Sequence, residues 1–139
     1  MIYNENNVTL NIDQDYATPK RADVYLNPQM SFNRELVLDV LITLVNESEN
    51  SIDCLDAFSA TGLCAIQWKK NIGHKVNITA IDLKDDCIEK IKLNCKLNKI
   101  EAITKTIVDI NDISEKSNTI NVCKASANVV MHLKAFDFM

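Results

Sequence analysis

Glycine and proline are scarce in this sequence, with two residues of each among 139. A chain so poor in both is neither collagen-like nor a low-complexity linker. The residues that are present, 47% hydrophobic and 24% charged, also exclude an intrinsically disordered chain. Domains cluster at about 100 to 150 residues. We therefore expect one globular domain with a single core.

Long apolar runs and a signal sequence are also missing. The longest apolar stretch, residues 36–45, is interrupted by Asp39 and Thr43 and is shorter than the roughly 20 residues that cross a bilayer. The first residues, Met-Ile-Tyr-Asn-Glu-Asn-Asn, have neither the basic start nor the apolar segment of a secretory signal. The sequence therefore predicts an intracellular protein with no membrane span.

The cysteines do not form the pattern of a metal site or of a disulfide framework. They lie at positions 54, 64, 87, 95 and 123, with no Cys-x-x-Cys pair and no histidine at ligand spacing. Each lies in an apolar periodic segment, so we expect these side chains to act as small buried hydrophobic groups. No metal site is predicted.

Positive charge is in deficit, because 15 lysines and arginines face 19 aspartates and glutamates, for a net charge of -4. A free-standing nucleic-acid-binding module is usually basic. We therefore expect that any contact with a nucleic acid is made mainly outside this chain.

Apolar periodicity divides the chain into a polar arm, residues 1–30, and an alternation of helices and strands, residues 31–139. The arm carries both prolines and predicts at most short strands. Residues 31–45 predict a helix that is apolar nearly all round and is therefore buried. The other expected elements are strands at 52–58, 76–81, 119–123 and 135–139, helices at 62–72, 84–98 and 127–133, and an irregular connection over residues 99–118.

Strands that alternate with helices form βαβ units, and such units build a parallel sheet with right-handed crossovers. The predicted fold class is therefore α/β with a Rossmann-like sheet. The fourth predicted strand is followed by no helix, so we expect a partial domain that is truncated in this strand.

In an open α/β sheet the ligand binds beyond the carboxyl ends of the strands. Three loops lie there in the predicted fold: residues 56–62, the turn at Asp82, and residues 125–128. Asp82 follows Gly62 by 20 positions, which is about the spacing at which a nucleotide-binding fold places an acidic residue for the ribose hydroxyls. The sequence therefore predicts a ligand that contains a nucleoside.

The side chains of the first loop select among such ligands. Ser59, Ala60 and Thr61 stand where a dinucleotide site needs glycines, so that the backbone can approach the pyrophosphate. S-adenosylmethionine has a ribose but no phosphate. The loop therefore favours S-adenosylmethionine over NAD or FAD.

Four motifs follow one another in an order that matches a known family. Residues 24–35, Val-Tyr-Leu-Asn-Pro-Gln-Met-Ser-Phe-Asn-Arg-Glu, are similar to an Asn-Pro-x-Met-x-x-Asn-Arg-Asp opening signature, and residues 55–63 to a first cofactor loop. Asp82-Leu83 is similar to an Asn-Asp-Ile at the second strand, and residues 127–131 to Asp-Ala-Asn-x-Leu-Met. Together they resemble the tRNA guanine-26 N2-dimethyltransferase family, and Val130-Met131-His132-Leu133 resembles its animal methyltransferase-like branch.

The resemblance implies a class I S-adenosylmethionine-dependent methyltransferase fold and methyl transfer to the exocyclic amine of a guanine in tRNA. Arg34 would pair with the carboxylate of the cofactor, Asp82 would hold the ribose, and Tyr25 would stack on the target base. The other cofactor residues that the resemblance implies are Asp56, Ser59, Ala60, Thr61, Gly62, Leu83, Ser126 and Ala127. A nuclear location is also implied.

The sequence departs from the family pattern at two positions. Cys64 stands where the main branch has an arginine, and Ser126 where an aspartate accepts the adenine amino group. The family's catalytic Asp-Pro-Phe-Gly motif would fall beyond Met139, as would its C-terminal tRNA-binding domain, so we expect no RNA methylation by this chain alone. A non-catalytic, RNA-associated adaptor that keeps the fold is the alternative.

Overall fold

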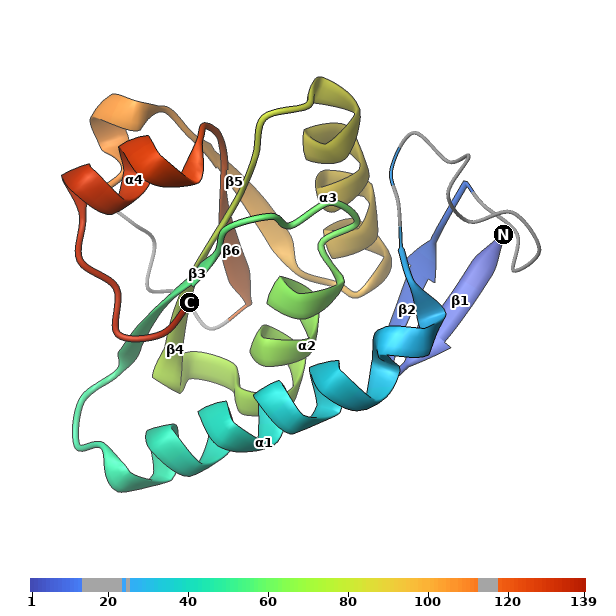
Figure 1. Cartoon of the computed structure of the whole chain (residues 1–139), viewed down its shortest axis with the longest axis horizontal. Helices are drawn as coiled ribbons and strands as arrows, with labels where there is room; N and C mark the ends of the chain where they lie inside the picture. Colours follow the sequence, from blue (N-terminus) through green and yellow to red (C-terminus); the bar gives the residue numbers. More distant parts are fainter. Residues whose placement is uncertain (14–23, 25, 113–117) are drawn as a thin grey trace.

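The computed structural model describes residues 1–13, 24, 26–112 and 118–139 (Figure 1). A parallel sheet with the strand order β3-β4-β6-β5 forms its centre. These strands are β3 (Ile52–Asp56), β4 (Val76–Asp82), β5 (Glu101–Lys105) and β6 (Thr119–Lys124). The α/β class and the Rossmann-like parallel sheet predicted from the sequence are confirmed.

Helices cover both faces of this sheet. Successive side chains of a strand point to opposite faces, so Cys54 of β3 joins the core beneath α1 (Ser31–Glu47), α2 (Leu63–Ile72) and α3 (Asp85–Leu97), whereas Leu55 joins a second cluster beneath α4 (Ala127–Leu133). Gly73 ends α2 with a φ of 86°. Short 3-10 turns lie at Pro28–Met30, Gly73–Lys75 and Ile107–Asp109.

Strand β5 corrects the expectation of an irregular connection over residues 99–118. It pairs with β6 at the edge of the sheet, and its five side chains are all exposed or half-buried. An edge strand of this length carries no run of buried apolar residues, so the hydrophobic pattern could not reveal it.

The strand expected at residues 135–139 is reduced to one parallel bridge between Cys54 and Phe138. The Leu55 amide donates to the Phe138 carbonyl oxygen at 2.9 Å, and the Phe138 ring meets Trp68 edge to face with centroids 5.5 Å apart. At Phe138 the chain therefore runs beside β3 in the same direction.

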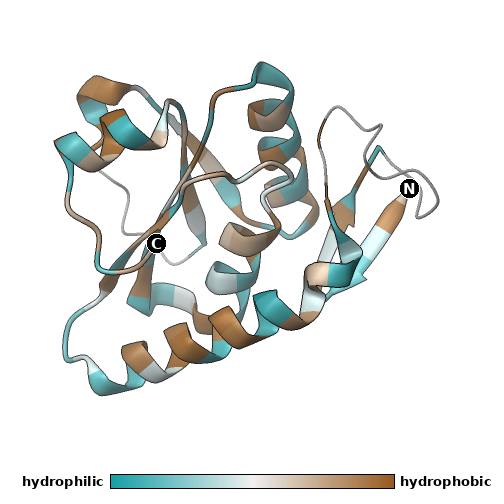
Figure 2. Cartoon of the chain, in the orientation of Figure 1, coloured by the Kyte–Doolittle hydropathy of each residue, from teal (hydrophilic) through white to brown (hydrophobic). Residues whose placement is uncertain are grey.

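Helix α1 is only partly buried, contrary to the sequence expectation. Leu38, Leu41 and Val45 are buried, while an apolar stripe on the other side is exposed to solvent and shows as brown segments along the helix (Figure 2). The stripe consists of Phe32, Leu36, Val37, Val40 and Leu44. The helix packs mainly on α2 at the margin of the domain, so only one side of it is covered.

The arm forms an antiparallel hairpin of β1 (Ile2–Glu5) and β2 (Val8–Asn11). Asn6 and Asn7 make the turn with φ values of 47° and 69°, the left-handed conformation that asparagine tolerates in two-residue hairpin turns. Tyr3, Val8 and Leu10 of the hairpin are buried in the core shared with the sheet, whereas Ile2 is exposed. No helix in the described part of the chain is long and apolar enough to cross a membrane.

Candidate functional site

Asp56 anchors the first candidate loop at the carboxyl end of β3. Its Oδ2 accepts hydrogen bonds from the Ser59 hydroxyl at 2.8 Å and from the Ala65 amide at 3.2 Å. One carboxylate oxygen therefore joins the strand end, the loop and the first turn of α2.

Two residues of this loop have left-handed backbone. Gly62 has a φ of 86° and Ala60 a φ of 49°. At Gly62 a Cβ would also lie 3.4 Å from the backbone of Ile91 on α3. Ala60 bears a strain of about 1 kcal/mol in this conformation, and such strain concentrates at functional sites.

The second loop meets the first at Asp82. Its Oδ2 accepts from the Ala60 amide and its Oδ1 from the Lys84 amide, both at 3.1 Å. The Ser59 amide donates to the carbonyl oxygen of Ile81 at 3.0 Å. The first and second loops are therefore in direct contact at the carboxyl ends of β3 and β4.

The third loop joins them through the backbone of Asp82. The Ala125 amide donates to the Asp82 carbonyl oxygen at 3.1 Å, and the hydroxyl of Ser126 caps α4 by accepting from the Val129 amide at 3.3 Å. Leu83, which follows Asp82 in the chain, is 62% exposed beside an open depression of about 460 Å³ lined by residues 83–86. The structure therefore gathers all three candidate loops around Asp82.

Burial perturbs the titratable groups of the first loop. It raises the pKa of Asp56 to about 6 against the opposing hydrogen bonds from Ser59 and the Ala65 amide, and the charge of Asp82 adds to the increase. Burial, followed by the negative charge of Asp56, raises the pKa of the Cys64 thiol to about 12. Titratable groups with perturbed pKa values concentrate at functional sites.

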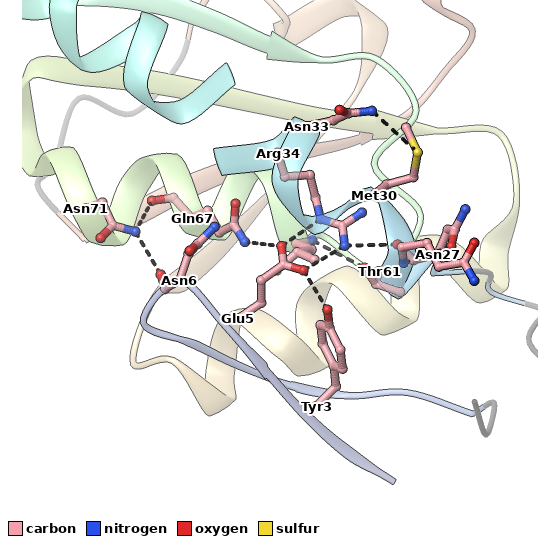
Figure 3. A network of polar contacts seen from close by, with 12 residues as sticks. Tyr3, Glu5, Asn6, Asn27, Met30, Asn33, Arg34, Thr61, Gln67 and Asn71 are labelled. Carbon is pink, nitrogen blue, oxygen red and sulfur yellow. Dashed lines mark hydrogen bonds and ion pairs between the residues drawn. The ribbon is translucent and has the colours of Figure 1, made fainter. Parts of the chain in front are cut away.

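Arg34 is held by a carboxylate from the hairpin. Its Nε and Nη2 donate to the two oxygens of Glu5, each at 2.7 Å, and Nη2 also donates to the Asn27 carbonyl oxygen at 3.0 Å. Figure 3 shows Tyr3 and Gln67 reaching the same carboxylate. The sequence analysis singled out Arg34 but missed Glu5, because no motif or periodic pattern marks a lone acid in the arm.

The hydrogen bonds of this network change the pKa values of Glu5 and Tyr3. Burial opposes ionisation of Glu5, but its hydrogen bonds with Arg34, Tyr3 and Gln67 lower the pKa of the carboxyl overall. Burial and the hydrogen bond to Glu5 raise the pKa of Tyr3 to about 12. Gln67 of α2 donates to Glu5 at 2.7 Å, so this pair lies against the helix that follows the loop anchored by Asp56.

Two other sequence predictions concern base stacking and the cysteines. Tyr25, the predicted base-stacking residue, lies outside the described residues. All five cysteines are free thiols, and all except the half-buried Cys64 are buried, as predicted. Within the described ranges, no three histidine, cysteine or acidic side chains lie close enough together to hold a metal ion.

Comparison with known proteins matches nearly the whole chain to one family. A family model described as N2,N2-dimethylguanosine tRNA methyltransferase matches residues 5–139. The chain belongs to this family. The match spans the hairpin acid Glu5, the opening signature, and the three loops around Asp82.

The bovine and human relatives are similar along nearly the whole chain. The proteins named tRNA (guanine(27)-N(2))-dimethyltransferase from Bos taurus and Homo sapiens are each 37% identical over 144 residues, covering 99% of this chain. The mitochondrial tRNA (guanine(26)-N(2))-dimethyltransferase of Saccharomyces cerevisiae is 41% identical over 64 residues, which cover 46% of this chain and 11% of the yeast protein. The chain spans 19% of the bovine and 20% of the human protein.

Two solved structures share the fold. The complex of Trm1 from Pyrococcus horikoshii with S-adenosyl-L-methionine has a TM-score of 0.56 and 27% identity, over 70% of this chain and 24% of that chain. Trm5b from Pyrococcus abyssi, at 19% identity and a TM-score of 0.51, covers 88% of this chain and 27% of its own, and supports the fold alone.

Proposed function

We propose that this chain is the cofactor-binding part of a tRNA methyltransferase that transfers a methyl group from S-adenosylmethionine to N2 of a guanine. One observation carries the proposal: the family match spans the three loops that meet at Asp82. The Pyrococcus Trm1 structure, which contains S-adenosyl-L-methionine, supports the choice of cofactor.

Asp82 is the proposed contact to the ribose. Each of its oxygens accepts one backbone hydrogen bond, from Ala60 and Lys84, and a carboxylate oxygen has two acceptor positions. Each oxygen therefore retains capacity for a ribose hydroxyl. Leu83 offers an exposed apolar surface for the adenine, and Ser126 and Ala127 begin α4 on the other side.

The first loop is proposed to line the amino-acid end of the cofactor. Its backbone from Ser59 to Gly62 is fixed by Asp56 and Asp82, so binding would require little reordering. Arg34 is the proposed partner of the cofactor carboxylate. The role of Tyr25 at the target base stays a prediction from the resemblance.

Catalysis itself is proposed to depend on residues other than these. Asp137 is not a candidate base at this site, because its Oδ2 accepts from the Asp53 amide near the amino end of β3, away from the three loops. The resemblance places the Asp-Pro-Phe-Gly motif after Met139, and a chain that continued beside β3 from Phe138 would lead toward the edge that carries Asp56. We further propose that tRNA is bound largely by other parts of the longer protein. The net charge of this chain, -4, supports this proposal, because a surface that binds nucleic acid is usually basic.

The nuclear location also remains a proposal.

The first test is isothermal titration of the chain with S-adenosylhomocysteine, with NAD as the negative control. We expect saturable binding of S-adenosylhomocysteine and no binding of NAD. The affinity for S-adenosylhomocysteine should fall at least about tenfold in Asp82→Ala, because two hydrogen bonds from the ribose to a charged acceptor are removed. Asp39→Ala, which removes an exposed aspartate on α1, is the matched control and should bind normally. A folded chain that binds neither ligand would instead support the adaptor alternative.

A hybrid protein tests methyl transfer. In it, this chain replaces the matching segment of the bovine relative, and incorporation of labelled methyl groups into tRNA is measured. We expect N2-methylguanine in the product, and none when the hybrid carries Asp82→Ala. A hybrid that binds S-adenosylhomocysteine but leaves tRNA unmodified would contradict the proposal.

A further inference from the structure

The ion pair between Glu5 and Arg34 links the hairpin to the start of α1, and both side chains are largely shielded from water. The side chain of Arg34 is 12% exposed and that of Glu5 is 6% exposed. The two residues are 29 positions apart, so the pair is a product of the tertiary fold. Its geometry is a two-bond fork between guanidinium and carboxylate, which constrains the orientation of both groups.

Hydrogen bonds fill the acceptor positions of Glu5. Oε1 accepts from the Tyr3 hydroxyl at 2.6 Å and from Arg34, and Oε2 accepts from Arg34 and from Gln67 Nε2 at 2.7 Å. A carboxylate has about four acceptor positions in all. Glu5 is therefore fully engaged and does not act as a free acid.

Arg34, by contrast, keeps donors in reserve. Both hydrogens of Nη2 are used, on Glu5 and on the Asn27 carbonyl, and the Nε hydrogen is used on Glu5. Among the described residues, none accepts a hydrogen bond from Nη1, which carries two more N–H donors. One corner of an otherwise fixed guanidinium is thus available to a ligand.

The position of Glu5 relative to the first loop is also fixed. Asn94 of α3 pairs with the amide and carbonyl of Asn11, and Asn98, which follows the last residue of α3, pairs with those of Thr9, at 2.7 to 3.3 Å. Asn94 Nδ2 also donates to the Thr61 carbonyl oxygen at 2.9 Å. The same side chain therefore holds the hairpin and the loop.

We propose that Glu5 is a positioning residue for Arg34, which it orients so that Nη1 binds the carboxylate of the amino-acid end of the cofactor. This inference rests on the proposed function. Nothing in the arm's composition indicates such a role, and it gives the hairpin a part in ligand recognition.

The test compares two ligands that differ only at the end in question. S-adenosylhomocysteine carries the amino-acid carboxylate and amine, whereas 5′-methylthioadenosine has the same nucleoside and thioether without either group. In Glu5→Gln, an amide donor would face the donors of Arg34 or Gln67. We expect the affinity of this variant for S-adenosylhomocysteine to be lower by at least about tenfold, which corresponds to the loss of one charge-assisted hydrogen bond. Its affinity for 5′-methylthioadenosine should stay within about twofold of that of the unaltered chain.

Three further variants sharpen the result. Asp13→Asn breaks a separate ion pair, Lys90–Asp13, which joins the arm to α3, and should change neither affinity. In an Arg34→Lys background, Glu5→Gln should add no further loss, because the group that it orients is gone. Tyr3→Phe removes one of the hydrogen bonds to Glu5 and, if Glu5→Gln does not fold, should still show a smaller selective loss for S-adenosylhomocysteine.

Two results would overturn the inference alone. Equal weakening of both ligands by Glu5→Gln would show a general structural role, and unchanged or tighter binding of S-adenosylhomocysteine would show that Glu5 does not orient Arg34 for a carboxylate. Failure of the unaltered, folded chain to bind either ligand would overturn the proposed function, and the inference with it.

Discussion

Replacing Asp56 with asparagine removes a carboxylate that the fold keeps away from water. Burial raises the pKa of Asp56 from 3.8 to about 6, so between these values the folded chain retains a proton that the unfolded chain releases. The free energy of unfolding therefore decreases as the pH rises through this range. At pH 7 the ionised side chain destabilises the fold by about 3 kcal/mol, the equivalent of the change in pKa.

Asparagine cannot ionise, yet its oxygen can still accept the hydrogen bonds of the Ser59 hydroxyl and the Ala65 amide. We expect Asp56→Asn to be more stable than the unaltered chain by up to about 3 kcal/mol at pH 7, with the gap closing toward pH 4. Such a cost, retained at a loop that carries the candidate site, agrees with a functional role for the carboxylate.

Urea unfolding at several pH values between 4 and 7 measures this difference. Trp68, the single tryptophan, is 4% exposed and reports unfolding by fluorescence. Asp39→Asn, which changes an exposed carboxylate on α1, is the control and should shift stability by less than about 0.5 kcal/mol at every pH. A gap between Asp56→Asn and the unaltered chain that is constant from pH 4 to 7, or a variant that is the less stable at pH 7, would refute the reasoning.

Two further predictions concern packing and the docking of the hairpin. Leu41→Ala on the buried side of α1 should lower the free energy of unfolding by about 2 to 5 kcal/mol, whereas Val40→Ala, at a position 59% exposed, should change it by less than about 0.5 kcal/mol; equal losses in urea unfolding would mean that the exposed stripe is covered in solution. Asn94→Ala should cost about 1 to 3 kcal/mol and speed hydrogen exchange at the Asn11 amide, because that amide loses its acceptor. Asn46→Ala, at an exposed position on α1, serves as its control, and unchanged exchange at Asn11 in Asn94→Ala would contradict the docking role.

Local sequence patterns were sufficient for the order of elements and for the three loops. The alternation of short apolar runs with helical periodicity is a local property, and it predicted β3, β4, β6 and the helices that follow them, with α4 bounded by the same residues, 127–133. The loop at Asp56 and the acid at Asp82 could also be predicted as candidate site residues, because parallel strands place their carboxyl ends on one edge of the sheet. In the structure the two loops are in direct contact, because the Ala60 amide donates a hydrogen bond to Asp82.

Tertiary structure alone decided which of these residues have partners and which faces are covered. The apolar composition of α1 predicted burial on all sides, but coverage depends on its neighbour, and α2 covers only one side. β5 is a strand because β6 supplies its hydrogen bonds, not because of its own half-exposed side chains. Glu5 meets Arg34 across 29 positions, and the hairpin that carries Glu5 is held by asparagines 83 and 89 positions away. Periodicity and spacing describe neighbours along one element, whereas hydrogen bonds and ion pairs depend on atoms brought within about 3 Å by the whole fold.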